Sequence, residues 1–370
     1  MKILFIKDKR NPSIDGAGVY LLRVCKVLNK KKIPYLLLYG SKKDLYYKEL
    51  KKNKINVKFI DFPQETPKNL FRFFRVYKLK QRIKKLINKE KFNIINTHFP
   101  HLNFFIHKSI KIPLISHWHG ADVKNKPLKV FDKNLLINFN IRDLLFKIYK
   151  KFNVFNFHLA RFVVVHGKAS KNTAIKKYYV NKNKIKINPY GVDTYNKKNN
   201  TIHEEFNLSK DTKIILSAGR IVKDKGVEEF CELAKKIQNN KIKFIYLGTY
   251  RKREYYDYII KRYSKYVIFP GNRLDIASFY KSSYLFLLLS RRESAGLVMA
   301  EAMNFGIPLI GWNIIGVNEI IKNENNGQLI RYKDTEKLRK VVKNLLLNKK
   351  KYLSMSKNSL ESFKNYKIKA

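Results

Sequence analysis

Short apolar runs alternate with longer amphipathic or basic segments along almost the whole chain, and this alternation restricts the fold more than any other feature. Strand candidates in the first half are the runs at 3–6, 35–40, 57–61, 92–98, 113–120 and 161–167. Strand candidates in the second half are the runs at 212–220, 243–248, 266–271, 284–290, 308–312 and 327–330. Apolar strands separated by helical segments are typical of a parallel sheet covered by helices. We therefore expect an α/β fold of doubly wound sheets.

The two series of strands indicate two domains in tandem. A chain of 370 residues, 45% of them hydrophobic, is long enough for two domains of ordinary size, each with its own core. We place the boundary near residue 190, because the segment 188–193 separates the two series and a polar tract at 196–201 follows it. The first domain is then 1–190. Ligands of open α/β sheets bind beyond the carboxyl ends of the strands, so residues just after strands are candidates for the site.

The net charge is strongly positive, since 79 Lys and Arg against 28 Asp and Glu give +51. One explanation is composition, because lysines are spread along the whole chain. The other is attraction to a polyanion, either nucleic acid or an anionic membrane surface. Between 68 and 91, basic residues interleave with apolar ones, which suits either a helix at a membrane interface or a solvated face over an ordinary core stripe. The membrane-facing candidates are Arg72, Arg75, Lys78, Arg82 and Lys85.

Cysteine and hydropathy patterns bear on the compartment and on metals. Cys25 and Cys231 lie far apart and belong to no CxxC or Cys/His cluster, which argues against zinc and favours a reducing compartment. The opening MKILFIK is too short for a signal peptide and is expected to be a strand. No run of about 18 apolar residues occurs, so we expect no membrane span. These patterns predict a cytoplasmic protein.

The segment 291–303 is the sharpest motif, because a predicted strand ends there and a helix begins. With Ser294 as the N-cap, the amides of Gly296, Leu297 and Val298 are expected to point out of the helix start, where a phosphate binds well. Glu293 before this start and Glu301 inside the helix could each hold hydroxyl groups of a ligand. The alternative is a surface Glu and an ordinary helical Glu.

Three weaker constellations also follow strands. Arg220 and Lys225 flank the turn after 212–220, where a forked guanidinium and an ammonium can reach one diphosphate. Gly16 and Gly18 follow the first strand region, where glycine lets the backbone approach a ligand, although a plain turn explains them equally well. His119 ends an apolar strand, as His98 and His166 do, which indicates either a polar cleft or structural histidines.

Taken in order, these pieces resemble glycosyltransferase family 4, whose members are retaining enzymes with the GT-B fold. The matching segments are GRIVKDKG (219–226), FIYLG (244–248), VIFPGNR (267–273), FYKSSYLFLLLSRRESAGLVMAEAMNFGIPLI (279–310) and, more loosely, NPYGVD (188–193) and SHWHGADV (116–123). The resemblance implies two Rossmann-like doubly wound domains that face a central cleft. It also implies a second domain over 191–352 and a C-terminal helix, 353–370, that packs back toward the first domain.

The resemblance implies a role for each site residue. Arg220 and Lys225 would bind the donor diphosphate, Glu293 the donor sugar and Glu301 the ribose. Ser294, Gly296, Leu297 and Val298 would line the donor site, Gly16 and Gly18 would approach the phosphates, and His119 would lie near the transferred sugar. We count His119, Glu293, Arg220 and Lys225 as catalytic. The chain has Ser294 and Ala295 where the family commonly has Gly-Phe, a departure that resembles transferases of surface-polysaccharide and lipopolysaccharide core assembly.

The expected function is transfer of a hexose or N-acetylhexosamine, with retention, from a nucleotide-diphosphate sugar to a saccharide or lipid-linked acceptor. UDP is the expected base, with GDP next. No cofactor and no metal are expected, because no Asp-x-Asp motif occurs and Arg220 and Lys225 would do the work of a divalent ion. The expected place is the inner face of the cytoplasmic membrane. The alternatives are a nucleotide-sugar epimerase or phosphorylase on the same fold and, from charge alone, a nucleic-acid-binding protein.

Overall fold

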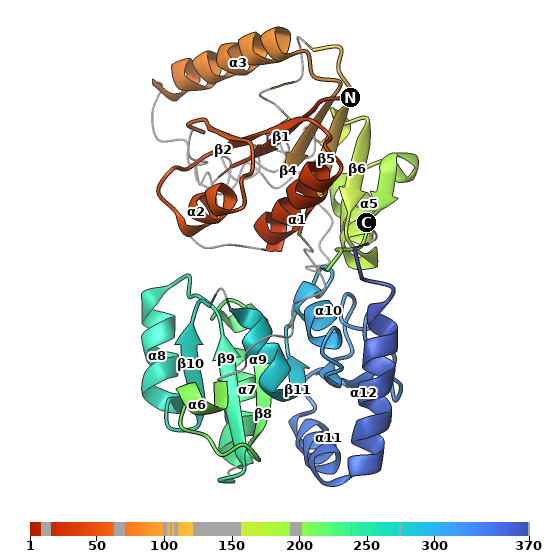
Figure 1. Ribbon diagram of the computed structural model, residues 1–370. Coiled ribbons are helices and arrows are strands. Elements are labelled where there is room, and N and C mark those ends of the chain that lie inside the picture. The colour runs from red at the N-terminus through yellow and green to blue at the C-terminus, as the bar shows by residue number, and fades with distance from the viewer. Residues whose placement is uncertain are drawn as a thin grey trace, which may run out of the picture. The chain divides into compact units, whose positions relative to one another are not determined.

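The chain divides into two compact units, Met1–Pro189 and Tyr190–Ala370, which are described here one at a time. The computed structural model describes residues 1–8, 16–62, 71–98, 102–103, 106, 110–120, 157–192, 202–237, 239–273 and 275–368. Each unit holds a parallel sheet covered by helices (Figure 1). The predicted fold class, two doubly wound α/β domains, is confirmed.

The first unit contains a seven-stranded parallel sheet in the order β3-β2-β1-β4-β5-β6-β7. Its strands are β1 (Ile3–Lys7), β2 (Tyr35–Tyr39), β3 (Val57–Phe59), β4 (Ile94–His98), β5 (Leu114–Trp118), β6 (Phe162–Val165) and β7 (Ile185–Ile187). Its described helices are α1 (Gly16–Lys30), α2 (Leu45–Lys52), α3 (Phe71–Glu90) and α5 (Lys168–Tyr178). The strand order reverses between β1 and β4, and such a switch point is where ligands bind in open sheets.

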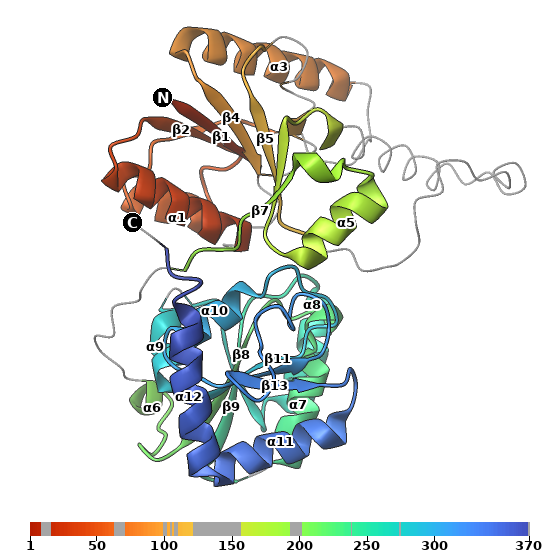
Figure 2. The ribbon, with the colours of Figure 1, turned by 90° about the vertical axis from the view of Figure 1, so that its right-hand side faces the viewer.

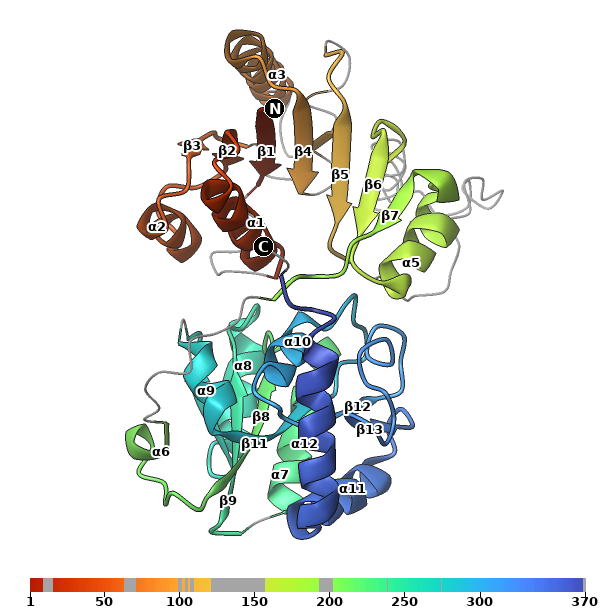
Figure 3. The same ribbon diagram turned by 45° about the vertical axis from the view of Figure 1, so that its right-hand side comes forward.

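Alternate residues of β1 and β2 pack against helices on opposite faces of the first sheet. Leu4 and Leu36 belong to the core under α3, whereas Phe5 and Leu37 belong to the core under α1 and α2. Figure 3 shows α1 and α3 on the two sides of the strands. Burial on both faces explains why the strands are continuous apolar runs rather than alternating ones.

The second unit contains a six-stranded parallel sheet in the order β10-β9-β8-β11-β12-β13. Its strands are β8 (Lys213–Ala218), β9 (Ile242–Leu247), β10 (Val267–Gly271), β11 (Ser283–Leu288), β12 (Leu309–Trp312) and β13 (Gly327–Ile330). Its α-helices are α6 (Ile202–Glu205), α7 (Val227–Lys236), α8 (Arg253–Tyr263), α9 (Ile276–Ser282), α10 (Leu297–Met303), α11 (Thr335–Leu347) and α12 (Lys349–Phe363). The helices α7, α8 and α11 cover one face, and α9 and α10 cover the other.

The last helix, α12, begins at Lys349 and belongs to the second unit. Phe363 joins the core that contains α9 and α10, and the hydroxyl of Ser359 donates to the carbonyl oxygen of Ile307 at 2.8 Å. Figure 2 shows α12 along the outside of this unit, next to α10 and α11. Packing of 353–370 against the first domain stays a prediction.

The described part of α3 has an apolar stripe in the core and basic residues on its exposed face. Leu79, Ile83 and Ile87 are buried in the core of the first unit. Lys78, Arg82 and Lys85 are exposed, while the side chains of Arg72 and Arg75 lie outside the described residues. The apolar stripe therefore serves the core, and the basic residues form the outer face. No helix in the described part of the chain is long and apolar enough to cross a membrane.

Because α3 buries its apolar stripe, we expect Ile83→Ala to destabilise the first unit by about 2–5 kcal/mol, the usual cost of a cavity in a core. Lys85→Ala on the exposed face should change stability by no more than about 0.5 kcal/mol. Thermal and urea unfolding of the two variants would measure the difference. Equal stabilities would show that α3 does not pack on the sheet.

Candidate active site

The predicted site residues of the second unit lie at the switch point of its sheet. Strands β8 and β11 are hydrogen-bonded neighbours at the centre of the strand order, so the segments that follow them start side by side. Arg220 and Lys225 follow β8, whereas Glu293 and Gly296 follow β11. A parallel sheet thus brings together residues about 70 positions apart at the edge where ligands bind.

Lys225 and Glu293 form an ion pair that joins these two segments. Lys225 Nζ lies 2.7 Å from Glu293 Oε2, and the side chains are only 21% and 12% exposed. The main-chain amide of Ser294 donates to Glu293 Oε1 at 3.1 Å. Glu293 is therefore held at both carboxylate oxygens, and its orientation is fixed before any ligand arrives.

Two further ion pairs join the same segments. Arg292 pairs with Asp224, and Arg291 NH2 lies 3.1 Å from Glu229 Oε1. The amide of Arg291 also donates to the carbonyl oxygen of Asp224 at 2.9 Å. The side chains of Arg291, Arg292 and Glu293 thus contact the turn and helix after β8. These ion pairs hold the two segments together.

Two glycines permit this close approach. Gly226, at the start of α7, has φ +66, and a Cβ there would lie 2.0 Å from the carbonyl oxygen of Leu289. Gly316 has φ +95, and a Cβ there would lie 2.4 Å from the carbonyl oxygen of Glu293. Both positions need left-handed backbone and the absence of a side chain. Gly316 thus packs directly on the backbone of Glu293.

The electrostatics of the pair favour an ionised Glu293. Burial raises the pKa of this carboxyl, but Lys225 and the Ser294 amide outweigh it and hold the pKa below its ordinary value. Arg220, by contrast, is exposed and makes no ion pair or side-chain hydrogen bond within the described residues. Of the two cations that follow β8, Lys225 is therefore engaged by a carboxylate, while Arg220 is available to a ligand.

The start of α10 differs from the sequence expectation. The helix begins at Leu297, and its N-cap is Gly296 with φ 52, so Ser294 is not the cap. The residue at the cap has a left-handed backbone, which glycine adopts without strain, and Ser294 lies in the preceding turn, where its amide donates to Glu293. Leu297 and Val298 are the first helical residues and are half-buried, and their amides have no acceptor inside the helix.

Glu301 lies inside α10, is 5% exposed, and accepts a hydrogen bond from the hydroxyl of Tyr280 at 3.0 Å. Tyr280 comes from α9 and is fully buried. The sequence does not identify Tyr280 as the partner of Glu301, because the separation of the two residues along the chain does not indicate a contact. Only the packing of α9 and α10 on one face of the sheet brings the two side chains together.

The predicted residues of the first unit lie at the corresponding edge of its sheet. Gly16 and Gly18 do not form a loop before a helix; they lie in the first turn of α1. Gly16 is exposed, and the carbonyl oxygen of Gly18 accepts from the Tyr46 hydroxyl at 2.9 Å. Backbone approach to a ligand at this place would therefore be made by helical amides.

His119 belongs to a cluster of four histidines at the ends of three adjacent strands. His98 pairs in register with His117, and Trp118 pairs with Val165, so His119 and His166 follow side by side. The Nδ1 of His98 lies 3.0 Å from the Nε2 of His119, and the ring of Tyr20 in α1 packs against all four imidazoles at 4.8–6.0 Å.

All four histidines of this cluster are neutral at physiological pH. Burial is the main cause: it lowers the pKa of His98 and His119 well below the ordinary value, that of His117 to about 3 and that of His166 to about 4. The sequence allowed either a polar cleft or structural histidines at these strand ends, and the structure adds that the four rings contact one another.

Comparison with known families now identifies the class of protein. The model of Glycosyltransferase Family 4 matches residues 14–195, and that of glycosyl transferases group 1 matches residues 198–362. Together the two matches cover nearly the whole chain. The chain belongs to this family, and it is a glycosyltransferase.

Individual relatives match about two thirds of the chain. The UDP-Gal:alpha-D-GlcNAc-diphosphoundecaprenol alpha-1,3-galactosyltransferase of Escherichia coli is 28% identical over 68% of this chain and 66% of that enzyme. The capsular polysaccharide biosynthesis glycosyltransferase CapM of Staphylococcus aureus is 24% identical over 70% of this chain and 69% of that protein.

Solved structures show the fold. HepE of Anabaena, in complex with UDP and glucose, has a TM-score of 0.78 and 17% identity over 99% of this chain and 95% of its own. WaaG, a glycosyltransferase involved in lipopolysaccharide biosynthesis, has a TM-score of 0.70 and 14% identity over 98% of this chain and 95% of its own. The expected GT-B fold is confirmed.

The pairing of Lys225 with Glu293 makes a prediction about titration. In Lys225→Met, burial of the carboxyl is no longer outweighed, so the pKa of Glu293 should rise from below to above its ordinary value. Carbon-13 NMR of labelled glutamate side chains would follow the titration, with Glu293→Gln used to assign the signal. An unchanged pKa in Lys225→Met would contradict the ion pair.

Proposed function

We propose that this glycosyltransferase moves a hexose or N-acetylhexosamine, with retention of configuration, from a UDP-sugar to a saccharide or lipid-linked acceptor in cell-surface polysaccharide synthesis. GDP-sugars are the second candidate donors. The observation that carries the proposal is the half-buried Lys225–Glu293 pair at the switch point of the second sheet, with the exposed Arg220 in the segment that also holds Lys225. The names of relatives support it, since one uses UDP-Gal and a structural neighbour binds UDP and glucose.

The geometry suggests what each group does when a donor binds. Arg220 offers a forked guanidinium that has no partner among the described residues, which suits the diphosphate. Lys225 can turn from Glu293 toward the same phosphates and stabilise the charge that builds on the leaving nucleotide diphosphate. Glu293, still held by the Ser294 amide and kept ionised, can then accept hydrogen bonds from sugar hydroxyls.

The remaining site residues have supporting roles in this proposal. Glu301, oriented by Tyr280, would bind the ribose hydroxyls. Ser294 and the segment Gly296–Val298 would contact the phosphates and sugar through the backbone. In the first unit, Gly16 and Gly18 would bind phosphate through helical amides. His119, as a neutral imidazole, would exchange a hydrogen bond with the transferred sugar.

Retention and metal independence are part of the proposal. No residue stands out as a covalent nucleophile, so we propose return of the acceptor on the same face through an ion-pair-like state. Arg220 and Lys225 supply the positive charge that a divalent ion supplies elsewhere, and no cofactor is required.

We also propose that the protein works peripherally on the cytoplasmic membrane surface, where a lipid-linked acceptor is found. The described outer face of α3 carries the basic residues and the exposed Tyr77, whereas Leu79, Ile83 and Ile87 belong to the core. The cations would supply an electrostatic attraction, and salt should weaken it.

A donor screen tests the proposed activity. Among UDP-, GDP- and ADP-sugars at about 100 times the dissociation constant, one should stabilise the protein by about 2.7 kcal/mol in thermal-shift measurements. Lys225→Ala and Glu293→Ala should lose this stabilisation, because each removes one half of the ion pair that meets the donor. The same donor should be hydrolysed or transferred in the presence of EDTA, and NMR of the product should show the anomeric configuration of the donor.

Lys223→Ala is the matched control, since Lys223 is exposed in the same turn and does not pair with Glu293. It should keep both stabilisation and activity. No response to any nucleotide sugar would contradict the transferase proposal, and salt-dependent binding of duplex nucleic acid instead would favour the alternative. Conversion of the donor without an acceptor into an epimer would indicate an epimerase.

Charge reversal on α3 tests membrane attachment. The triple variant Lys78→Glu, Arg82→Glu, Lys85→Glu should bind anionic vesicles at least about 100-fold more weakly at low salt, because each cation near the surface contributes about 1 kcal/mol. The triple variant Lys337→Glu, Lys340→Glu, Lys343→Glu on α11 changes the net charge equally at exposed positions and should bind as the wild type does. Co-sedimentation with phosphatidylserine vesicles measures both, and equal loss in the two variants would show that no particular face is used.

A further inference from the structure

The histidine cluster of the first unit has a second possible use. One ring nitrogen from each of His98, His117 and His119 lies within 4.8 Å of the other two. These residues come from β4 and from the end of β5, which are paired strands of a rigid sheet. We propose that these three histidines bind one divalent transition-metal ion of the Zn²⁺ type, and that the bound ion inhibits sugar transfer.

The spacing of one pair already suits such an ion. His98 Nδ1 and His119 Nε2 are 3.0 Å apart, with 16° between the ring planes, so these two nitrogens face one another. Two nitrogens of a tetrahedral Zn²⁺ site, each at about 2.0–2.1 Å from the metal, are about 3.3 Å apart. The nitrogen–nitrogen distance therefore suits the ion within a few tenths of an ångström, and both rings must turn so that their lone pairs converge on an ion beside the line that joins the two nitrogens.

His117 supplies the third nitrogen. Its Nε2 contacts the amide nitrogen of Asn96 at 3.1 Å, while its Nδ1 is buried and has no hydrogen-bond partner. The Asn96 Oδ1 is also buried and without a partner. If the Asn96 amide is turned over, its oxygen accepts Nε2–H and leaves Nδ1 unprotonated, which is how second-shell groups orient a metal-binding histidine.

Binding also requires His117 to turn. The rings of His98 and His117 are nearly parallel, with 8° between their planes. A nitrogen lone pair lies in its ring plane, so His117 must turn about χ2 to direct Nδ1 to the same ion. The intrinsic minimum of this torsion is broad in histidine, so the neighbouring rings set the cost of the turn.

The chemistry of the cluster selects the ion. Three neutral imidazoles suit Zn²⁺, Co²⁺, Ni²⁺ or Cu²⁺, whereas Mg²⁺, Ca²⁺ and Mn²⁺ prefer oxygen ligands. The ammonium of Lys7 is the nearby charge that opposes a cation, because it acts on both His98 and His119. We therefore expect a site of moderate affinity that is selective against Mg²⁺.

Inhibition follows from the proposed function, on which this step rests. His119 would contact the transferred sugar, and an ion on its Nε2 would turn and fix the ring and place a positive charge next to the sugar position. Binding of the ion itself does not depend on the activity, so the two can be tested separately.

The test uses the full chain without a histidine tag. Co²⁺ should bind at one equivalent and give the intense d–d absorption of a tetrahedral site, and Zn²⁺ should displace it. X-ray absorption of the Zn²⁺ form should show at least three nitrogen ligands at about 2.0–2.1 Å. His117→Phe, which keeps a ring in the stack, should weaken binding at least 30-fold, while His158→Phe, at an exposed position outside the cluster, should not.

Inhibition is measured as the Zn²⁺ concentration that halves each variant's own metal-free rate. It should equal the dissociation constant in the wild type and rise with it in His117→Phe. Tight binding that His117→Phe leaves unchanged, or fewer than three nitrogens around the ion, would overturn the site whether or not the variant folds. A confirmed site in a protein that transfers no sugar would leave the site standing and refute the proposed function instead.

Discussion

The half-buried ion pair of Lys225 and Glu293 is the contact on which the candidate donor site depends. A carboxylate that is 12% exposed would be costly without a partner, and Lys225 at 2.7 Å removes that cost. The pair can exist only because β8 lies beside β11, and because Gly226 and Gly316 let three backbone segments meet. The site is thus a product of strand order first and of side-chain chemistry second.

The positions of the strands were the property that the sequence predicted best. Strands buried on both faces must be apolar throughout, so runs such as YLLLY and YLFLLL stand out from the basic segments around them. A helix between 68 and 91 was suggested by the interleaving of basic and apolar residues. Its buried residues Leu79, Ile83 and Ile87 recur at helical spacing. Periodicity of this kind follows from burial alone and needs no knowledge of distant contacts.

Contacts between distant segments are what the sequence could not supply. Tyr280 meets Glu301 only because α9 and α10 share one face of the sheet. The start of α10 was also misplaced: Ser294 has the chemistry of an N-cap, but the turn that holds it continues to Gly296, which takes the cap with a positive φ. The glycosyltransferase motif indicated these residue types, whereas tertiary packing decided their partners.

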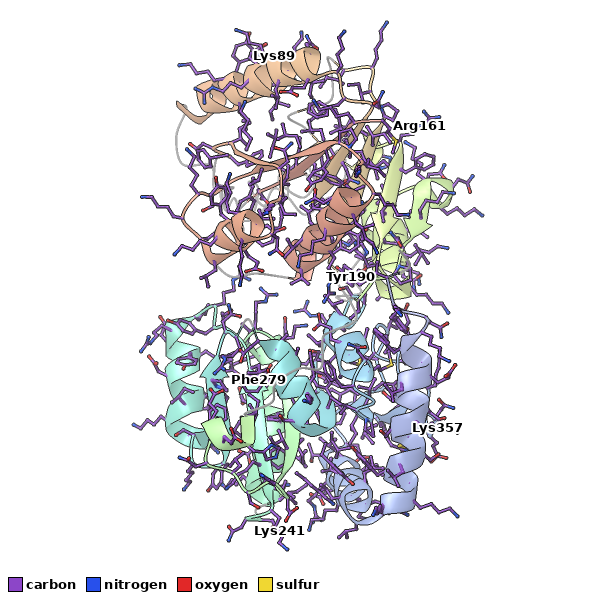
Figure 4. All side chains as sticks on the ribbon, viewed as in Figure 1. Lys89, Arg161, Tyr190, Lys241, Phe279 and Lys357 are labelled. Atoms are coloured by element: carbon purple, nitrogen blue, oxygen red, sulfur yellow. The ribbon has the colours of Figure 1, made fainter. Side chains whose placement is uncertain are left out.

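The positive charge and the histidine cluster can be understood together. Lys89, Lys241 and Lys357 lie on the outside of elements in both units (Figure 4), so much of the +51 charge is spread over the surface, as composition would give. Charges placed where a diphosphate is expected are different, because Arg220 and Lys225 would, in the proposed function, act without an ion. A metal that bridges phosphates needs oxygen ligands, while the histidine cluster offers nitrogen only. The proposed metal-independent transfer and the proposed inhibitory site are therefore compatible in one chain, because the two would use different ligand chemistry.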